Sequence, residues 1–348
     1  MKSLIVFACI ILFPFLLFSQ IPDGYYSAAE GLTGEGLQNA LYGVIKGHTE
    51  YPYSSSETDT WDILKESDRD PENAENVILF YTGWSVNAAQ EYNNENGWNR
   101  EHVWAKSRGD FGTSPGPGTD THHLRPSDIS VNFARNNRWF DNCVTPYVDG
   151  GLETGCFTSV SSWVWQPRAE VKGDVARMIF YMATRYEGES GEPDLQVIDY
   201  FPADDYTNDP VHAKLSTLLV WHQEDSVDAF EQNRNEVIYG YQGNRNPFID
   251  HPEYVNKIWG PEPALGVEHS AHESVGVYPN PARDMLSIDL EKSGLYTLEI
   301  CSINGQLLSS KSFNGKSYQA DLSSLPRGVY LLHIWSAELR VTQKIIKQ

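Results

Sequence analysis

Long apolar runs are scarce in this sequence of 348 residues. The longest covers residues 4–18, which at about 15 residues is short for a membrane span, and the basic residue Lys2 precedes it. This pattern predicts a secretory signal peptide over residues 1–20, with cleavage near Ser19 or Gln20. Because no later segment is comparably apolar, the mature protein is expected to have no stable membrane span.

Basic residues are also scarce, with 26 Lys and Arg against 47 Asp and Glu and a net charge of -21. The excess lies in residues 21–262, where 17 basic residues face 39 acidic ones, whereas residues 263–348 hold eight of each. Such a charge argues against tight, non-specific coating of nucleic acid. Residues 98–142 are expected to repel a phosphate less, since they carry six basic residues against five acidic ones.

Cysteine is rare as well, and Cys9 lies in the predicted signal peptide. Cys143 and Cys156 are 13 positions apart and flank a loop that contains Pro146 and several glycines. In an oxidising compartment we expect a disulfide between them, which would contribute about 3 kcal/mol; two free buried thiols are the alternative. Cys301 lies in an apolar, strand-like run and is expected to be an unpaired core residue.

The sequence has no HExxH zinc motif, no Gly-rich phosphate loop and no Gly-x-Ser-x-Gly elbow. It has instead a concentration of reactive groups in three short segments. These are residues 99–104 (NREHVW), 120–126 (DTHHLRP) and 131–136 (VNFARN). A histidine, a carboxylate, an amide and several arginines so close together are the groups needed to cut a phosphodiester with one divalent metal ion.

The same segments predict a strand over residues 101–104, a loop over 105–121 and a second strand over 122–125. A helix is expected after Pro126, with Ser127 or Asp128 as its N-cap. In this ββα arrangement a histidine on the first strand faces a ligand on the helix. Adjacent strand residues point to opposite faces, so a shared site for Glu101 and His102 requires a bend or a position at the strand edge.

The composition changes near residue 262, which divides the chain into domains. Residues 21–261 have mixed helical and β patterns, and the polar residues 262–274 are expected to form a linker. Residues 275–348 alternate short apolar runs with turn signals at intervals of about ten residues, which predicts a small all-β sandwich. The expected fold class is therefore α+β, followed by an all-β domain.

The final domain resembles the C-terminal sorting domain of the type IX secretion pathway. The resemblance rests on residues 277–284 (VYPNPARD), 303–306 (INGQ), 325–330 (LPRGVY) and 344–347 (KIIK). It implies that the secretion machinery is a partner, that the protein is exported, and that this domain is often removed afterwards. Without the resemblance, the same residues would be a β-sandwich appendage of open function.

The larger domain resembles the endonuclease I family of His-Me finger nucleases. Besides the three central segments, the resemblance includes residues 165–168 (WQPR), 171–178 (VKGDVARM), 219–222 (LVWH) and 244–253 (NRNPFIDHPE). It extends over about 240 residues, from near Gly24 to Trp259. It implies a secreted, metal-dependent endonuclease of low sequence specificity that acts on DNA, with RNA left open as a second substrate.

The resemblance also implies roles for individual residues. His102 would be the general base, because a neutral imidazole can take a proton from water near neutral pH. Glu101 and Asn132 would bind the metal, and these oxygen donors favour Mg²⁺, with Mn²⁺ or Ca²⁺ as alternatives. The products would carry 5′-phosphate and 3′-hydroxyl ends.

An arginine is expected to hold the scissile phosphate, because its planar guanidinium matches the phosphate oxygens. Arg108, Arg125 and Arg135 are the candidates, and the sequence does not choose among them. His122 matches a family position that shapes the site, and His123 stands where some relatives have Asn. Taken without the resemblance, each would be a hydrogen-bonded structural histidine.

Two other functions stay open at this stage. One is a secreted binding or adhesion protein that keeps the nuclease scaffold without its activity, although the presence of Glu101, His102 and Asn132 speaks against it. The other is a phosphodiesterase for small or lipid-linked substrates. In each case the protein is expected to act as a monomer.

Overall fold

The structure, a computed structural model, describes residues 21–92, 97–202, 208–260, 275–302, 307–336 and 340–348. It divides into two compact units, an N-terminal unit that ends at Glu262 and a C-terminal unit that begins at Pro263. The predicted signal peptide (1–20) and the predicted linker (262–274) lie outside the described residues. Within the described ranges, no helix has the length and apolar character that a membrane crossing requires.

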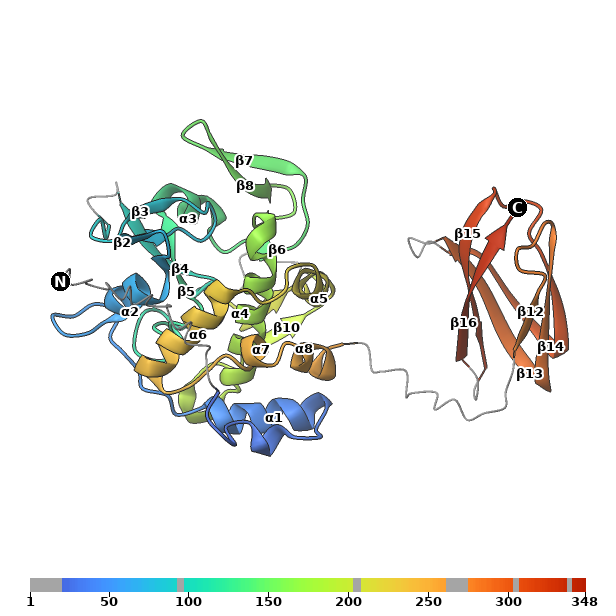
Figure 1. Ribbon diagram of the computed structural model, residues 1–348, viewed down its shortest axis with the longest axis horizontal. Helices are drawn as coiled ribbons and strands as arrows, with labels where there is room; N and C mark the ends of the chain where they lie inside the picture. Colours follow the sequence, from blue (N-terminus) through green and yellow to red (C-terminus); the bar gives the residue numbers. More distant parts are fainter. Residues whose placement is uncertain (1–20, 93–96, 203–207, 261–274, 303–306, 337–339) are drawn as a thin grey trace, which may run out of the picture. The chain divides into compact units, whose positions relative to one another are not determined.

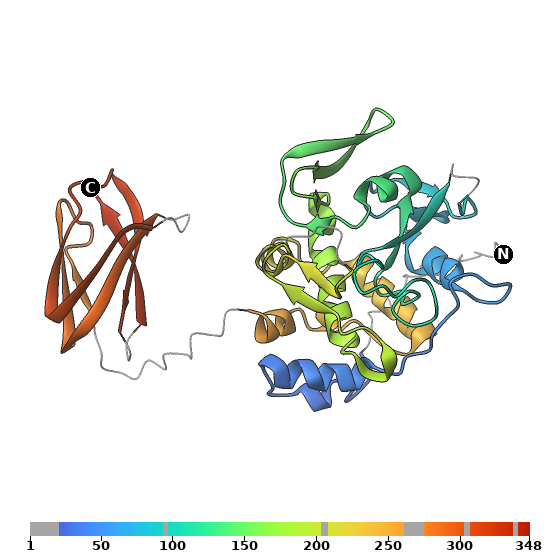
Figure 2. The same cartoon turned by 180° about the vertical axis from the view of Figure 1, so that it is seen from behind.

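The N-terminal unit is built from helices that surround one central helix. Its α-helices are α1 (Gly34–Ile45), α2 (Thr60–Ser67), α3 (Ile129–Arg135), α4 (Lys172–Arg185), α5 (Leu215–Glu224), α6 (Ala229–Gln242), α7 (Pro247–Asp250) and α8 (Glu253–Ile258). Short 3-10 turns lie at Ser27–Ala29, Ala169–Val171 and Glu189–Gly191. Helix α4 runs through the middle of the unit in both views, with α1, α5 and α7 in contact with it (Figures 1 and 2).

Small sheets complete the N-terminal unit. β1 (Arg69–Asp70), β2 (Asn73–Ile78) and β3 (Ser85–Asn87) form one sheet, and β4 (Trp98–His102) pairs with β5 (Leu124–Asp128) in another. β6 (Trp139–Phe140), β9 (Val164–Gln166), β8 (Leu152–Ser159) and β7 (Thr145–Asp149) form a third sheet in that order, and β10 (Gln196–Ile198) pairs with β11 (Val211–Ala213). This mixture of helices and strands confirms the predicted class of the larger domain.

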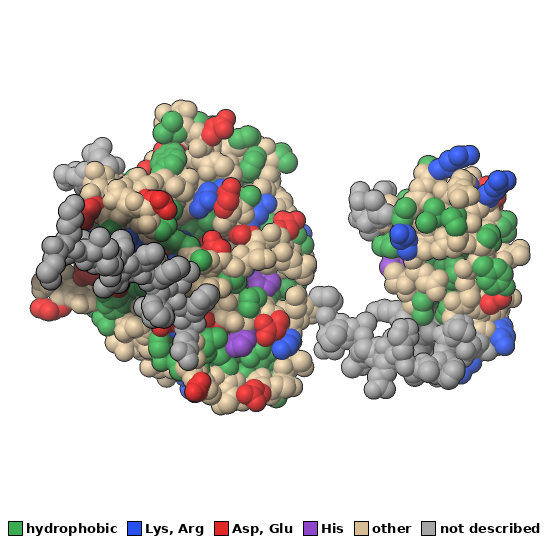
Figure 3. Space-filling model, in the orientation of Figure 1, with side chains coloured by type: hydrophobic (Ala, Val, Ile, Leu, Met, Phe, Trp, Pro, Cys, Tyr) green, Lys and Arg blue, Asp and Glu red, His purple; other side chains and the backbone are tan. Residues whose placement is uncertain are grey.

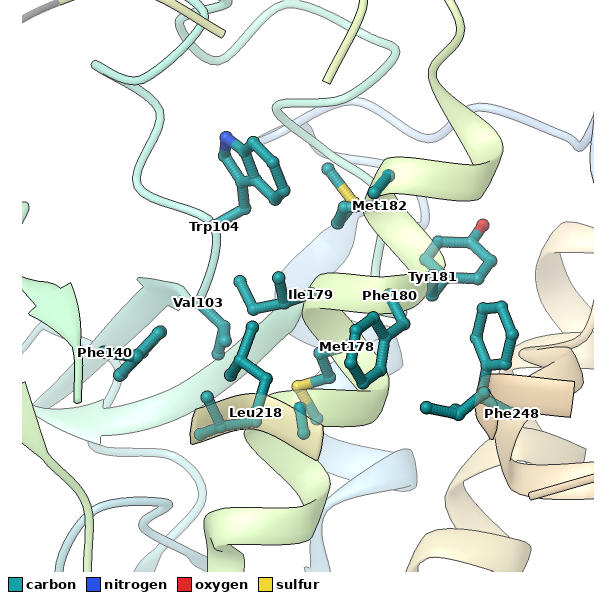
Figure 4. Close-up of a cluster of buried hydrophobic side chains, with 14 of the residues drawn as sticks. Val103, Trp104, Phe140, Met178, Ile179, Phe180, Tyr181, Met182, Leu218 and Phe248 are labelled. Atoms are coloured by element: carbon teal, nitrogen blue, oxygen red, sulfur yellow. The ribbon is translucent and has the colours of Figure 1, made fainter. Parts of the chain in front are cut away.

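The hydrophobic core of this unit is organised by α4, of which every residue from Gly173 to Arg185 is buried. Figure 4 shows its side chains packed among residues of several other elements. The labelled residues are Val103, Trp104, Phe140, Met178, Ile179, Phe180, Tyr181, Met182, Leu218 and Phe248. Val103 and Trp104 directly follow β4, and Trp104 Nε1 donates a hydrogen bond of 2.7 Å to the Arg108 carbonyl. The core therefore anchors the end of β4, and truncation of a buried Trp there would cost about 3–5 kcal/mol.

Strands β4 and β5 and helix α3 form the predicted order of strand, loop, strand and helix. β4 and β5 are antiparallel, with Trp98 opposite Asp128 and His102 opposite Leu124. Of the two predicted N-cap candidates, Asp128 is the N-cap of α3, and its Oδ1 accepts hydrogen bonds from the backbone N–H groups of Ser130 and Val131. Both strands are displaced from their expected positions, because Val103 and Trp104 leave the strand to enter the core.

The expected disulfide between Cys143 and Cys156 is absent, and both thiols are free. Cys156 lies within β8, where its Sγ donates to the Tyr81 carbonyl at 3.1 Å. Cys143 precedes β7, and the pairing of Thr145 with Thr158 leads the chain away from Cys156. A spacing of 13 positions was therefore a misleading signal, because the hairpin register and not the loop length decides which residues face each other.

The C-terminal unit is all-β, as predicted, and consists of β12 (Gly276–Tyr278), β13 (Met285–Ser302), β14 (Leu307–Asp321), β15 (Gly328–Trp335) and β16 (Arg340–Lys347). The two sheets expected for a sandwich are in fact one five-stranded sheet that forms a half-barrel. The cause is the length of β13, whose first part pairs with β12, whose last part pairs with β15, and which pairs with β14 along both. Cys301 is buried and free, as predicted.

Candidate active site

A cavity of about 410 Å³ lies where β4, α3 and the segment after β4 meet. Its lining is almost entirely polar. It consists of Tyr53, Asn99, Arg100, Glu101, His102, Ala105, Lys106, Ser107, Asn132, Arg135, Asn136 and Asn137. The predicted residues Glu101, His102 and Asn132 are therefore brought to one place, together with Arg135.

Both faces of β4 contribute residues to this cavity. Asn99 and Glu101 lie on the face toward α3, where they contact Asn132 and Arg135. Arg100 and His102 lie on the opposite face and contact Tyr53. β4 pairs with β5 in a two-stranded sheet, and residues of both faces of β4 line the cavity. The cavity therefore takes in residues of both faces of β4, and the chain bends directly after His102.

Glu101 is a buried carboxylate with only 2% of its surface exposed. Its Oε1 accepts a hydrogen bond of 2.7 Å from the Tyr81 hydroxyl, and Arg135 Nε lies 3.3 Å away. Burial raises the pKa of Glu101 above its usual value, although Arg135 and Tyr81 both act in the opposite direction. The protein alone thus does not fully compensate this negative charge, and an additional cation would stabilise it.

Asn132 lies on α3 opposite the strand. Its Nδ2 donates a hydrogen bond of 2.8 Å to Asn99 Oδ1. This contact fixes the orientation of the amide and leaves Asn132 Oδ1, an oxygen donor, as the atom available to a ligand in the cavity.

His102 is held in one tautomer. Its Nε2 lies 3.0 Å from the Gly118 carbonyl, and because a carbonyl only accepts hydrogen bonds, Nε2 must carry the proton. Nδ1 is then the basic nitrogen. The rings of Tyr53 and His123 lie 5.8 and 5.6 Å from the imidazole.

The surroundings of His102 keep its imidazole neutral. Burial lowers the pKa of His102 well below its usual value, and His123, Lys106 and Arg100 add to the effect, while the bond to Gly118 opposes it. A neutral imidazole with a fixed basic nitrogen is suited to accept a proton from water.

His122 and His123 are buried structural residues outside the cavity lining. Nε2 of His122 lies 3.1 Å from the Asn244 carbonyl, and Nε2 of His123 lies 2.7 Å from the Pro117 carbonyl. Burial lowers the pKa of each to about 4, so both rings are neutral at pH 7. His123 contacts the ring of His102 and so limits its position.

Arg135 is the one predicted arginine that lines the cavity. Its Nη1 donates to the carbonyls of His102 and Asn136 at 3.3 and 2.8 Å, and its Nη2 donates to the Val103 carbonyl at 2.6 Å. With Nε beside Glu101, most of the guanidinium is engaged by the protein itself.

Arg108 and Arg125 are not part of the cavity lining. Arg108 donates to the Asn137 carbonyl from Nε and Nη2, at 3.0 and 2.6 Å, and its guanidinium lies over the ring of Trp139. Arg125 forms buried ion pairs, with Nε 2.7 Å from Asp68 Oδ1 and Nη1 3.1 Å from Asp174 Oδ2. The structure therefore does not bring these two arginines to the predicted site.

Several lining residues were not singled out from the sequence. Tyr53 lies far upstream in a segment with no motif, so no local signal could have placed it here. Ser107 and Asn137 are joined by a hydrogen bond of 3.3 Å, which ties the segment after β4 to the end of α3. Asn136 has a positive φ of +53°, which non-glycine residues rarely adopt and which occurs often at functional sites.

The cavity offers oxygen ligands for a metal ion. In the parts of the chain that the structure describes, no three His, Cys, Asp or Glu side chains are grouped to hold a metal by themselves. The donors at the cavity are instead the Glu101 carboxylate and the Asn132 amide oxygen, from β4 and α3. Few protein oxygens and room for water suit Mg²⁺, which keeps several of its waters, and the uncompensated Glu101 charge fits a cation.

Comparison with known families gives two matches, one in each unit. Residues 33–253 match the family described as endonuclease I, and residues 276–348 match the family described as the secretion system C-terminal sorting domain. The second match confirms the predicted sorting domain and, with it, the prediction that the protein is secreted.

Two curated relatives are similar to the N-terminal unit. The extracellular ribonuclease of Bacillus subtilis (strain 168) is 52% identical over 238 residues, which are 68% of this chain and 78% of the relative. The extracellular ribonuclease of Bacillus amyloliquefaciens is 51% identical over 238 residues, with the same coverage of both chains.

Proposed function

Because the chain belongs to the endonuclease I family, we propose that this secreted nuclease hydrolyses phosphodiester bonds within nucleic acids, at the cavity between β4 and α3 and with the help of a metal ion. The observation that carries the proposal is the presence of Glu101, His102 and Asn132 in the lining of one cavity. Each presents the atom that its role requires: a carboxylate, a basic ring nitrogen and an amide oxygen.

His102 acts as the general base in this proposal. Nδ1 takes a proton from a water molecule, whose oxygen then attacks phosphorus, and the hydrogen bond from Nε2 to Gly118 keeps the ring oriented during the transfer. The bond from phosphorus to the 3′ oxygen breaks. The 3′ oxygen leaves with a proton from solvent, so the products have 5′-phosphate and 3′-hydroxyl ends.

Glu101 and Asn132 are proposed as the protein ligands of the metal, for which Mg²⁺ is favoured over Mn²⁺ or Ca²⁺. When bound, the cation would neutralise phosphate charge and stabilise the leaving oxygen. Tyr81 and Arg135 hold the Glu101 carboxylate in place from the side of the core. Arg135 is thus proposed as a positioning residue for Glu101, and its backbone contacts also fix the end of β4.

Both RNA and DNA are proposed as substrates, with low sequence specificity. RNA is supported by the curated relatives, which are named extracellular ribonucleases. In the proposed reaction the attacking group is water, so a 2′-hydroxyl is not required and a DNA strand can react in the same way. The polar lining offers groups suited to phosphate and metal, which are common to every nucleotide.

The C-terminal unit is proposed to contact the type IX secretion machinery, and the nuclease unit is proposed to act as a monomer.

On the face shown in Figure 3, acidic side chains are spread over the N-terminal unit and basic ones are few. A surface of this kind favours distributive cutting over tight coating of the substrate.

The proposal is tested by cleavage of a supercoiled plasmid and of a long RNA, with and without EDTA. We expect EDTA to stop cleavage of both and excess Mg²⁺ to restore it. The RNA products should carry 5′-phosphate ends, whereas attack by the 2′-hydroxyl would leave 2′,3′-cyclic phosphates. Cleavage that survives chelation would refute the metal role. Failure on both polymers, with activity on a small diester, would support the phosphodiesterase alternative.

A further inference from the structure

We propose that Lys106, and not one of the arginines of the motif, contacts a phosphate oxygen of the nucleic-acid strand bound at the cavity. This inference rests on the proposed function, since it assigns a contact within the same site. It follows from the contacts that each positively charged side chain near the cavity makes with other protein groups.

The arginines around the cavity are held by protein groups. Arg125 lies between two buried carboxylates, and Arg108 donates twice to the Asn137 carbonyl. Arg135 faces Glu101 and three backbone carbonyls. A new bond to phosphate would require each of them to give up buried contacts, which is costly.

Arg100 lines the cavity but is also held in place. Its guanidinium lies between the rings of Tyr53 and Trp61, at 3.3 and 4.0 Å from their centroids. Its Nη1 donates to Tyr53 and Thr60, and its Nη2 donates to Ser54 at 3.2 Å. This arginine therefore fixes Tyr53 beside His102, with both of its Nη atoms engaged by the protein.

Lys106 differs from these arginines in its exposure. It is the exposed cationic residue of the cavity lining, and it lies in the segment that directly follows β4, between Ala105 and Ser107, which also line the cavity. Its ammonium group is a compact charge on a flexible chain, with three donors that can follow a phosphate oxygen in more than one position. It can therefore serve RNA and DNA strands of different geometry.

The charge of the surroundings makes such a contact important. Residues 21–262 carry 17 basic and 39 acidic residues, so the N-terminal unit as a whole repels a polyphosphate. Glu101 adds a buried negative charge at the site itself. An exposed ammonium group at the cavity rim offsets part of this repulsion where the strand must lie.

The test measures binding and not turnover. The parent is His102→Ala, which is expected to bind without cutting, and it is compared with His102→Ala/Lys106→Met and His102→Ala/Lys106→Arg. Lys257→Met, added to the same parent, is the matched control, because Lys257 is an exposed lysine on α8 outside the cavity lining. Affinity for a short fluorescein-labelled single strand is followed by anisotropy over a series of salt concentrations, at fixed Mg²⁺.

A lost phosphate contact has a specific signature. Lys106→Met should weaken binding to a similar extent for strands of different sequence, and the slope of log affinity against log salt should fall in magnitude by about 0.7, the value for one phosphate contact on a single strand. Lys106→Arg should keep most of the slope, and Lys257→Met should leave the affinity and slope of the parent unchanged. In the wild-type background, Lys106→Met should raise KM more than it lowers kcat.

An unchanged slope in Lys106→Met would overturn the inference, whether affinity is kept or lost, because a loss without a change of slope points to a disturbed fold. This failure is distinct from failure of the proposed function. In the first case the wild-type protein still cuts polymers in a metal-dependent manner, and in the second it does not.

Discussion

Two buried carboxylates, 19 positions apart in the sequence, have different roles in this molecule, one structural and one proposed to bind the metal. Asp120 and Glu101 are both almost fully buried, with 1% and 2% of their surface exposed. Asp120 accepts hydrogen bonds from the hydroxyls of Tyr181 and Tyr186 at 2.7 and 2.9 Å, and from Gln242 Nε2 at 3.0 Å. Glu101 has the Tyr81 hydroxyl and the neighbouring Arg135 on the core side, and lines the cavity.

The pKa shifts of the two carboxylates go in opposite directions. Burial by itself raises the pKa of Asp120, but His48, His122 and Gln242 outweigh it and hold the pKa well below its usual value. Burial raises the pKa of Glu101, and its protein partners do not outweigh it. A buried charge that the protein fully compensates is a structural element, whereas one that the protein leaves uncompensated beside a cavity is suited to bind a cation.

Glu101→Gln should have the largest effect in this comparison. The substitution removes the proposed anionic metal ligand, so most of the cleavage activity should be lost and the remaining activity should require a higher Mg²⁺ concentration. The melting temperature, measured with EDTA present, should fall only slightly, because the Gln side chain keeps its shape and its Oε1 can still accept a hydrogen bond from Tyr81 and face Arg135. Plasmid nicking against Mg²⁺ concentration and a thermal melt provide the two readouts.

Glu153→Gln is the control for this change, since Glu153 is an exposed residue of β8 outside the cavity. A Glu101→Gln protein with the activity and Mg²⁺ dependence of the control would exclude Glu101 as a metal ligand.

Asp120→Asn should have the opposite profile. The side chain keeps its shape but loses its charge and one acceptor group, so that a buried donor on Tyr181, Tyr186 or Gln242 is left unpaired. We expect the free energy of unfolding to fall by about 1.5–3 kcal/mol, as measured by urea denaturation, while the folded protein still cleaves nucleic acid. The exposed Asp110, in the same loop, provides the control Asp110→Asn. Loss of activity in a stably folded Asp120→Asn protein would contradict the claim that Asp120 has a purely structural role.

The pH dependence of the unfolding free energy provides a further test of the role of Asp120, with a smaller expected effect. Because the pKa of Asp120 is lower in the folded state, its stabilising contribution is complete above the unfolded-state pKa of about 3.9 and is lost as the pH falls further. The difference in unfolding free energy between wild type and Asp120→Asn should therefore be constant near neutral pH and shrink below about pH 4. The measurement is urea denaturation over this pH range. A difference in unfolding free energy that grows as the pH falls would contradict a lowered pKa of Asp120 in the folded state.

Local signals account for what the sequence predicted well. The strand, loop, strand and helix of the site follow from short apolar runs, a Gly- and Pro-rich loop and a helix cap, and Asp128 is one of the two caps that were expected. From the sequence it was not clear how Glu101 and His102, as neighbours on a strand, could share one cavity, because adjacent strand residues point to opposite faces. The answer depends on how β4, α3 and the segment after β4 meet around one cavity, which is a property of the tertiary structure.

Long-range packing accounts for what the sequence did not reveal. Tyr53 reaches the cavity from a distant segment, and Arg125 is drawn away by Asp68 and Asp174, which lie far from it in the chain. The expected bond between Cys143 and Cys156 failed for the same reason, because strand register decides which residues meet. Residue type and spacing identified the chemistry, whereas the partners of each charge were settled only in three dimensions.

The central claim is that His102 is the base of a nucleolytic site, and it is tested most directly by the cleavage rate of His102→Ala with plasmid and Mg²⁺. His333→Ala, which alters a histidine of the C-terminal unit, is the control. The account predicts a rate about 10² to 10⁴ times lower for His102→Ala, with a cooperative thermal melt that shows the variant to be folded, and full activity of the control. A folded His102→Ala protein that cuts the plasmid at the wild-type rate would contradict the account.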